Sequence, residues 1–77
     1  MEYGAIDLHK RRSQIRIVRE DGSVVLERKV DTTRDDFDRV FGDRTPMRLL
    51  IESSTESEWV AQHLEQIGHE VVVVVSI

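Results

Sequence analysis

Apolar and polar positions alternate in residues 13–19, and this period of two predicts a β-strand. Strand-like runs also precede and follow it, so that the three runs span residues 3–9, 13–19 and 24–30. Between the second and third runs lies Asp21-Gly22, a pair that suits a two-residue turn with positive φ. We therefore expect a hairpin there, and an antiparallel meander of three strands for the first part of the chain.

The spacing of apolar residues becomes helical after the third run. Thr32 or Thr33 is placed to cap a helix, and Phe37, Val40 and Phe41 have the i, i+3, i+4 spacing of a buried stripe. A glycine directly after this stripe marks the expected end of the helix.

A further strand, helix and strand are predicted in the second half. Residues 47–52 form an apolar run that closes on an acid, and the next helix is expected to start from a reciprocal capping pair, Thr55 and Glu58. Its apolar face continues to Ile67, and the unbroken run Val71–Val75 follows. A β-branched run of this kind is typical of a parallel strand that is covered on both faces.

The order of these elements predicts an α/β fold, β-β-β-α-β-α-β. Parallel strands joined through a helix form a right-handed crossover, so the last two strands extend the sheet beyond the first strand. We predict a mixed five-stranded sheet of order 3-2-1-4-5 with two helices, which is half of a ribonuclease-H-like (RuvC-like) domain. In this order the strands of Asp7 and Glu52 are parallel neighbours.

Length and composition limit the class of protein. The chain has 77 residues, enough for one small domain, and its 39% hydrophobic and 34% charged residues are ordinary for a soluble protein. No apolar stretch approaches the roughly 20 residues that a membrane-spanning helix needs. The chain has no cysteine and does not start with a basic segment followed by an apolar one. We expect a cytoplasmic protein without a membrane partner.

Charge is distributed unevenly along the chain. The net charge of −4 argues against a nucleic-acid partner, yet all eleven Lys and Arg residues lie between Lys10 and Arg48. A local nucleic-acid-binding patch can form around Lys10, Arg11 and Arg12, beside an acidic centre that repels phosphate unless a divalent cation neutralises it. The alternative for any single one of these residues is a solvated charged surface.

Two acids at the ends of apolar strands are the candidate catalytic and metal-binding residues. Asp7 and Glu52 are predicted on neighbouring parallel strands, and paired carboxylates supply the hard oxygen ligands that Mg²⁺ needs in phosphoryl transfer. The alternative is that Asp7 makes a local hydrogen bond and that Glu52 is a solvated residue between a strand and a helix. The three histidines share no metal-binding spacing.

Two other kinds of site fit the sequence less well. The cluster Ser53-Ser54-Thr55 precedes a helix and has no adjacent base, so we interpret it as a helix cap rather than a nucleophile. An actin-like or sugar-kinase nucleotide-binding half domain starts with a similar strand and hairpin, but it needs small residues after its first aspartate so that backbone amides approach phosphate. Here residues 8–11 (LHKR) follow Asp7 and are expected to obstruct such a loop.

Three short motifs occur in residues 3–10 (YGAIDLHK), 51–59 (IESSTESEW) and 68–73 (GHEVVV). Together, in this order, they resemble the DEDD transposases with a RuvC-like catalytic domain, which include Piv-type DNA invertases and bridge-RNA-guided insertion-sequence transposases. The resemblance covers essentially all of residues 1–77, as the N-terminal portion of that catalytic domain.

This resemblance implies a metal-dependent DNA transposase or recombinase, with Asp7 and Glu52 as catalytic Mg²⁺ or Mn²⁺ ligands and residues 10–12 guiding the nucleic-acid backbone. It implies DNA, and a guide RNA in some members, as partners of the full-length protein. The remaining two aspartates and the nucleophilic serine of the family would lie beyond Ile77, so the chain alone is expected to be inactive and to bind cations weakly or not at all. At Ala5 the chain departs from the family, where glycine is common.

A different class of function is an inactive structural module that associates with itself. The valine run Val71–Val75 is the last predicted strand and would present an open edge. Such edges pair with other strands, so a homo-oligomer formed through this edge is the second expectation.

Overall fold

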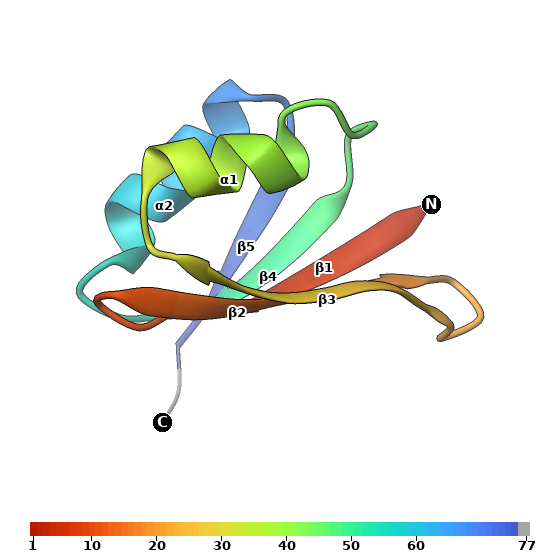
Figure 1. Cartoon of the computed structure of the whole chain (residues 1–77), viewed down its shortest axis with the longest axis horizontal. Helices are drawn as coiled ribbons and strands as arrows, with labels where there is room; N and C mark the ends of the chain where they lie inside the picture. Colours follow the sequence, from red (N-terminus) through yellow and green to blue (C-terminus); the bar gives the residue numbers. More distant parts are fainter. Residues whose placement is uncertain (76–77) are drawn as a thin grey trace.

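The computed structural model describes residues 1–75, which form a mixed five-stranded sheet and two helices (Figure 1). In chain order the elements are β1 (Glu2–Asp7), β2 (Arg12–Arg19), β3 (Val24–Asp31), α1 (Arg34–Phe41), β4 (Arg48–Glu52), α2 (Ser57–Gln66) and β5 (Glu70–Val74). The strand order is β3-β2-β1-β4-β5, with antiparallel pairing among β1, β2 and β3 and parallel pairing of β4 with β1 and with β5. The predicted element order and strand order are confirmed.

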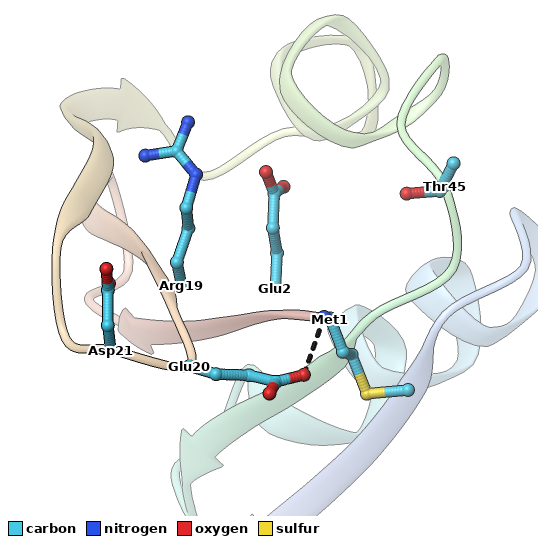
Figure 2. A pocket seen from close by; sticks show the side chains of 6 residues that line it. All are labelled: Met1, Glu2, Arg19, Glu20, Asp21 and Thr45. Atoms are coloured by element: carbon cyan, nitrogen blue, oxygen red, sulfur yellow. Dashed lines mark hydrogen bonds and ion pairs between the residues drawn. The ribbon is translucent and has the colours of Figure 1, made fainter.

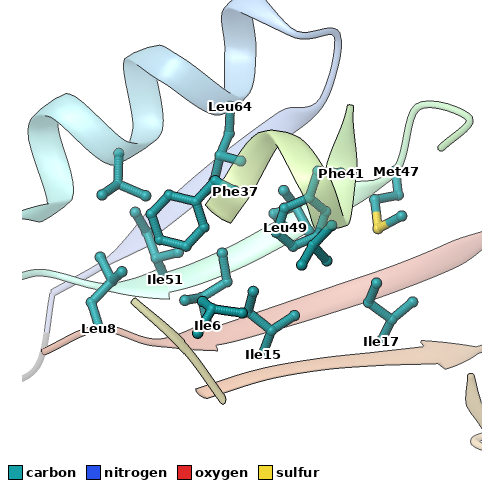
Figure 3. Close-up of a cluster of buried hydrophobic side chains, with 13 residues drawn as sticks. Ile6, Leu8, Ile15, Ile17, Phe37, Phe41, Met47, Leu49, Ile51 and Leu64 are labelled. Carbon is teal, nitrogen blue, oxygen red and sulfur yellow. The ribbon is translucent and has the colours of Figure 1, made fainter. Parts of the chain in front are cut away.

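Both helices cover the same face of the sheet (Figure 1), and the hydrophobic core lies between them and the strands (Figure 3). Alternation along the strands sends every second side chain toward the helices, as the period of two requires. Phe37 and Phe41 of α1 are fully buried in this layer. The other buried apolar residues are Ile6, Leu8, Ile15, Ile17, Val30, Val40, Met47, Leu49, Ile51, Val60 and Leu64.

The turn between β2 and β3 is a three-residue loop, so the predicted two-residue turn is wrong although the hairpin is confirmed. The Gly22 amide donates to the Arg19 carbonyl at 2.9 Å, and the Arg19 amide donates to the Ser23 carbonyl at 2.9 Å. Of the loop residues only Gly22 has positive φ, at 87°. A two-residue turn of the predicted type needs positive φ at both central residues, which Asp21 does not adopt.

The start of α1 follows the prediction. Thr33 is the N-cap, and its hydroxyl accepts a hydrogen bond from the Asp36 amide at 3.2 Å. Acids in the first turn also complement the partial positive charge of the helix N-terminus. Neither helix in residues 1–75 has the length and apolar character needed to cross a membrane.

The start of α2 does not follow the prediction. The helix begins at Ser57, and the capping pair of Thr55 with Glu58 does not form. Instead the Ser57 hydroxyl donates to the Ser54 carbonyl at 2.8 Å and accepts from the Ser54 amide at 3.2 Å. This serine pair closes a turn ahead of the helix, so the helix starts later than the capping pair would place it.

The face of the sheet away from the helices is uncovered in residues 1–75. β5 is an edge strand that pairs only with β4, and Val72, Val73 and Val74 are all exposed. The expectation that Val71–Val75 is covered on both faces is therefore wrong for this part of the chain. Both helices lie on one side of the sheet, and the outer edge of β5 has no neighbouring strand within the described residues.

A close approach of β1 to β4 makes Gly4 sensitive to substitution. A Cβ atom at Gly4 would clash with the Leu49 side chain, which is fully buried and has little room to move. We expect Gly4→Ala to lower the free energy of unfolding by about 1–3 kcal/mol, as overpacking commonly does. Urea unfolding followed by circular dichroism measures this, and Ala5→Ser on the uncovered face is the control, with an expected change within about 0.5 kcal/mol.

Candidate functional site

Asp7 and Glu52 come together at one end of the sheet. They close the parallel neighbours β1 and β4, one residue after the paired positions Ile6 and Ile51. Because Ile6 and Ile51 point into the core, the two acids point to the uncovered face. Both line one open depression of about 460 Å³, together with Ala5, Ile6, Leu50, Ile51 and Val74. The predicted placement of the two acids on adjacent parallel strands is confirmed.

The two carboxylates differ in their surroundings. Oδ2 of Asp7 lies 3.3 Å from Nε2 of His9, and both side chains are exposed. An exposed pair of this kind contributes little to stability and can be displaced by a stronger ligand. Glu52 is exposed, and no ion pair to its carboxylate occurs within residues 1–75.

The connection after Asp7 is anchored by hydrogen bonds to Thr32. The hydroxyls of Ser13 and Thr32 are buried and lie 2.6 Å apart, and the Thr32 hydroxyl donates to the His9 carbonyl at 2.6 Å. The Thr32 amide donates to the Arg11 carbonyl at 2.8 Å. These bonds fix the connection between β1 and β2 to the segment that leads into α1.

Leu8 is the first residue of this connection, but its side chain is part of the hydrophobic core. Its side chain is buried against the other apolar residues. The expectation that residues 8–11 obstruct a phosphate-binding loop stays a prediction, and His9 is the side chain of this segment that contacts the Asp7 carboxylate.

The predicted basic residues divide into two groups. Lys10 and Arg11 are exposed in the connection that follows Asp7, at the same end of β1 as the two carboxylates. Arg12 is the first residue of β2, and its Nε lies 3.6 Å from Oδ1 of Asp31 on β3. Lys10 and Arg11 are thus the cations of this segment that are placed for an anionic ligand beside Asp7.

The carboxylates alone do not complete a metal-binding site. Residues 1–75 contain no group of three or more Asp, Glu, His or Cys side chains arranged to hold a metal ion. Mg²⁺ commonly binds through one or two carboxylates and fills its remaining positions with water and phosphate oxygens. The arrangement of Asp7 and Glu52 therefore suits a cation that arrives with an anionic ligand better than a resident metal ion.

A second depression, of about 540 Å³, lies at the opposite end of β1 (Figure 2). Each of its carboxylates already has a partner within the chain, and that of Glu2 is Arg44, at 3.5 Å. The pKa of Glu20 is lowered by a hydrogen bond from the ammonium group of Met1, at 2.8 Å, and by the charge of that group. The pKa of Asp21 is lowered by hydrogen bonds from the Ser23 hydroxyl and amide. These carboxylates are satisfied within the chain and carry no comparable site.

His69 is an internal polar residue whose role the sequence did not indicate. It is buried, Nδ1 accepts a hydrogen bond from the Met47 amide at 3.2 Å, and Nε2 donates to the Phe41 carbonyl at 2.9 Å. This pattern requires the neutral tautomer with hydrogen on Nε2. The position between Gly68 and the valine run gives no sign of these partners, because both are distant in the chain. His69 is structural and lies outside the candidate site.

No protein-family model matches the chain. No curated protein sequence matches it either.

Among solved structures, the chain is similar to Ppx/GppA phosphatases of Aquifex aeolicus. The type II variant of that phosphatase is 16% identical with a TM-score of 0.47, and a second structure of the enzyme is 14% identical with the same TM-score. Both matches cover 97% of this chain and 36% of the other. A further structure of the Aquifex aeolicus family member is 16% identical with a TM-score of 0.42, covering 97% and 35%. The chain thus spans about a third of the length of these proteins.

The DEDD transposase prediction is wrong by these comparisons. It depended on three short motifs, no family model supports it, and the similar structures are phosphatases rather than DNA transposases or recombinases. Short motifs of this kind, in which a polar residue follows an apolar strand, occur in unrelated proteins that share the same arrangement of strands. The assignments to transposition and to DNA recombination are wrong together with it.

Proposed function

We propose that this chain is half of a binding domain for a phosphorylated ligand that carries a divalent cation, such as a nucleotide. Asp7 and Glu52 bind the cation, and Lys10 and Arg11 face the phosphate groups. The cation is Mg²⁺ or Mn²⁺, and its affinity for the chain without the ligand is weak. The proposal also includes the cytoplasmic location that the sequence led us to expect.

The observation that carries the proposal is the position of the two acids in the sheet. From β1 the chain continues to β2, the neighbour of β1 on one side. From β4, the neighbour of β1 on the other side, the chain continues to β5, which lies farther from β2 still. The connections therefore diverge between β1 and β4, and in open α/β sheets ligands bind at the carboxyl ends of the strands at such a point. Asp7 and Glu52 are the residues that close these two strands.

Electrostatics favours a cation as the bridge. Two neighbouring carboxylates repel a phosphate group, and a divalent cation between them reverses the sign of the local field. Lys10 and Arg11 then attract the part of the anion that extends past the cation. Because the two protein carboxylates leave several coordination positions of the cation unfilled, phosphate oxygens and water can occupy them.

The test is a titration of the ¹⁵N-labelled chain with MnCl₂, alone and then with ADP or pyrophosphate. Paramagnetic Mn²⁺ should broaden the amide signals around Asp7, Glu52 and Val74 first, and each phosphate compound should increase the affinity for Mn²⁺. Asp7→Asn and Glu52→Gln should each weaken Mn²⁺ binding about tenfold, which corresponds to about 1.4 kcal/mol.

Two matched variants control for the loss of negative charge. Asp43→Asn and Glu65→Gln remove exposed acids elsewhere on the chain and should leave Mn²⁺ binding unchanged. Broadening centred on another region, or an affinity that both Asp7→Asn and Glu52→Gln leave intact, would contradict the proposal.

A further inference from the structure

The uncovered face of the sheet presents a contiguous apolar surface, which we call the open face. Its apolar members are Tyr3 of β1, Leu50 of β4, and Val72 and Val74 of β5, exposed to 37%, 47%, 37% and 40%. The pairing of Leu50 with Val72 and of Tyr3 with Arg48 places these side chains on one side of the sheet. Exposed apolar surface of this kind, bordered by charges, marks an interaction site.

A shallow groove runs through the open face. It has a volume of about 370 Å³ and is lined by Tyr3, Gly4, Ala5, Arg16, Val18, Arg48 and Leu50.

The charges on the open face have opposite signs at the two ends of β4. Arg48 begins the strand and Glu52 ends it, with Leu50 midway, and alternation places all three on the same face. Arg48 is also paired with Glu70 of β5, its Nε lying 3.2 Å from Oε1. This surface pair is exposed and can rearrange at low cost.

We infer that the open face binds a second copy of this chain in a symmetric, face-to-face dimer. A two-fold axis through the level of Leu50, perpendicular to the strands and parallel to the sheet, brings Leu50 against the partner's Leu50. The same axis places Arg48 over the partner's Glu52 and Glu52 over the partner's Arg48. An interface with two-fold symmetry must be self-complementary in this way, and two sheets pack face to face at about 10 Å.

The third charged side chain at the centre of the face is compatible with this arrangement. Arg16 lies at the level of Leu50, since it pairs with Ala5 and Ala5 pairs with Leu50. Its cross-strand neighbour on β3 is Glu27. The axis therefore places Arg16 over the partner's Arg16 and Glu27 over the partner's Glu27, and because the two pairs are neighbours across β2 and β3 the set of four has no net charge.

The size of the face sets the expected strength of the dimer. Five strands about 4.8 Å apart and about 17 Å long give a footprint of roughly 400 Å² per copy. Stable complexes bury about 800 Å² per partner. We therefore expect a dimer that forms at high micromolar concentration and dissociates on dilution.

The edges of the sheet are the competing route to self-association, and they differ from one another. The β3 edge carries Glu27, Arg28 and Lys29 and has a register shift opposite Ile17 and Val18, features that oppose edge pairing. The β5 edge has valines and no such charge after Glu70. Pairing of two β5 edges leaves Leu50 solvent-exposed, so a substitution there separates the two routes.

The experiment is sedimentation velocity of the 77-residue chain over a concentration series, with EDTA present so that no cation competes for Glu52. The chain should shift from monomer to dimer as concentration rises. Leu50→Lys should abolish the dimer, while Val73→Lys at the β5 edge, on the helix side of the sheet, should leave it. Leu50→Ser is a milder variant, and circular dichroism verifies that each variant is folded.

Charge reversal provides the sharper test. Arg48→Glu and Glu52→Arg should each weaken the dimer at least tenfold, and the double variant should restore it, because the reversed pair is again complementary across the axis. The two residues lie about 13 Å apart along one strand, so the restoration cannot come from a contact within one copy. A monomer at every concentration, or a dimer lost in Val73→Lys but kept in Leu50→Lys, would overturn the inference.

Discussion

Replacing Phe37 with alanine is expected to remove about 3–5 kcal/mol from the free energy of unfolding. Phe37 projects from α1 into the centre of the core, is fully buried, and packs against Trp59 of α2 with ring centroids 6.0 Å apart. A domain of 77 residues has a total stability of roughly 4–12 kcal/mol. The alanine variant should therefore lose at least about a quarter of this stability, and all of it at the lower end of the range.

Urea denaturation followed by circular dichroism and by Trp59 fluorescence measures this loss. Phe37→Leu keeps most of the volume and should cost much less, about 1 kcal/mol. An alanine variant within about 1 kcal/mol of the parent chain would mean that the helices are not packed on the sheet as described.

Replacing His69 with alanine should cost about 2–4 kcal/mol, the second largest effect. The Met47 amide loses its acceptor while it remains buried, which costs about 1–3 kcal/mol, and the edge-on contact with Phe41 is lost as well. The Phe41 carbonyl is less affected, because it also accepts from the Arg44 amide at 3.3 Å.

His69→Asn separates the two contributions, because the asparagine oxygen can take the place of Nδ1 and accept from the Met47 amide. Its stability should lie between those of the parent chain and the alanine variant. His9→Ala removes an exposed histidine and should be nearly neutral in thermal unfolding. Equal stability of the alanine and asparagine variants would show that the bond from the Met47 amide contributes nothing.

The fold was predictable from local patterns. Alternation in β2, the helical spacing of Phe37 with Phe41, and a capping threonine at position 33 depend on neighbours within a few residues, so the sequence contains them. Connection rules then set the strand order. The exact turn geometry at Gly22 and the start of α2 at Ser57 were not predictable, because several polar residues in each segment offer alternative hydrogen bonds.

The burial of β5 was mispredicted for a different reason. A run of valines indicates a strand, yet its burial depends on which elements cover each face, and that information lies outside the run itself. The predicted convergence of Asp7 and Glu52 succeeded because both close strands that lie side by side and parallel. Short motifs around the same two residues nevertheless led to the wrong protein family, since a polar residue at a strand end is compatible with many chemistries.

The parallel pairing of β1 with β4 has a consequence for the order of folding. β1, β2 and β3 can form from neighbouring segments, whereas β4 reaches β1 only after the chain between them has closed a long loop around α1. Non-local pairings of this kind slow folding. Asp7 and Glu52 therefore become neighbours only after β4 has paired with β1, and a partly folded chain that retains the meander alone would have no place for a cation.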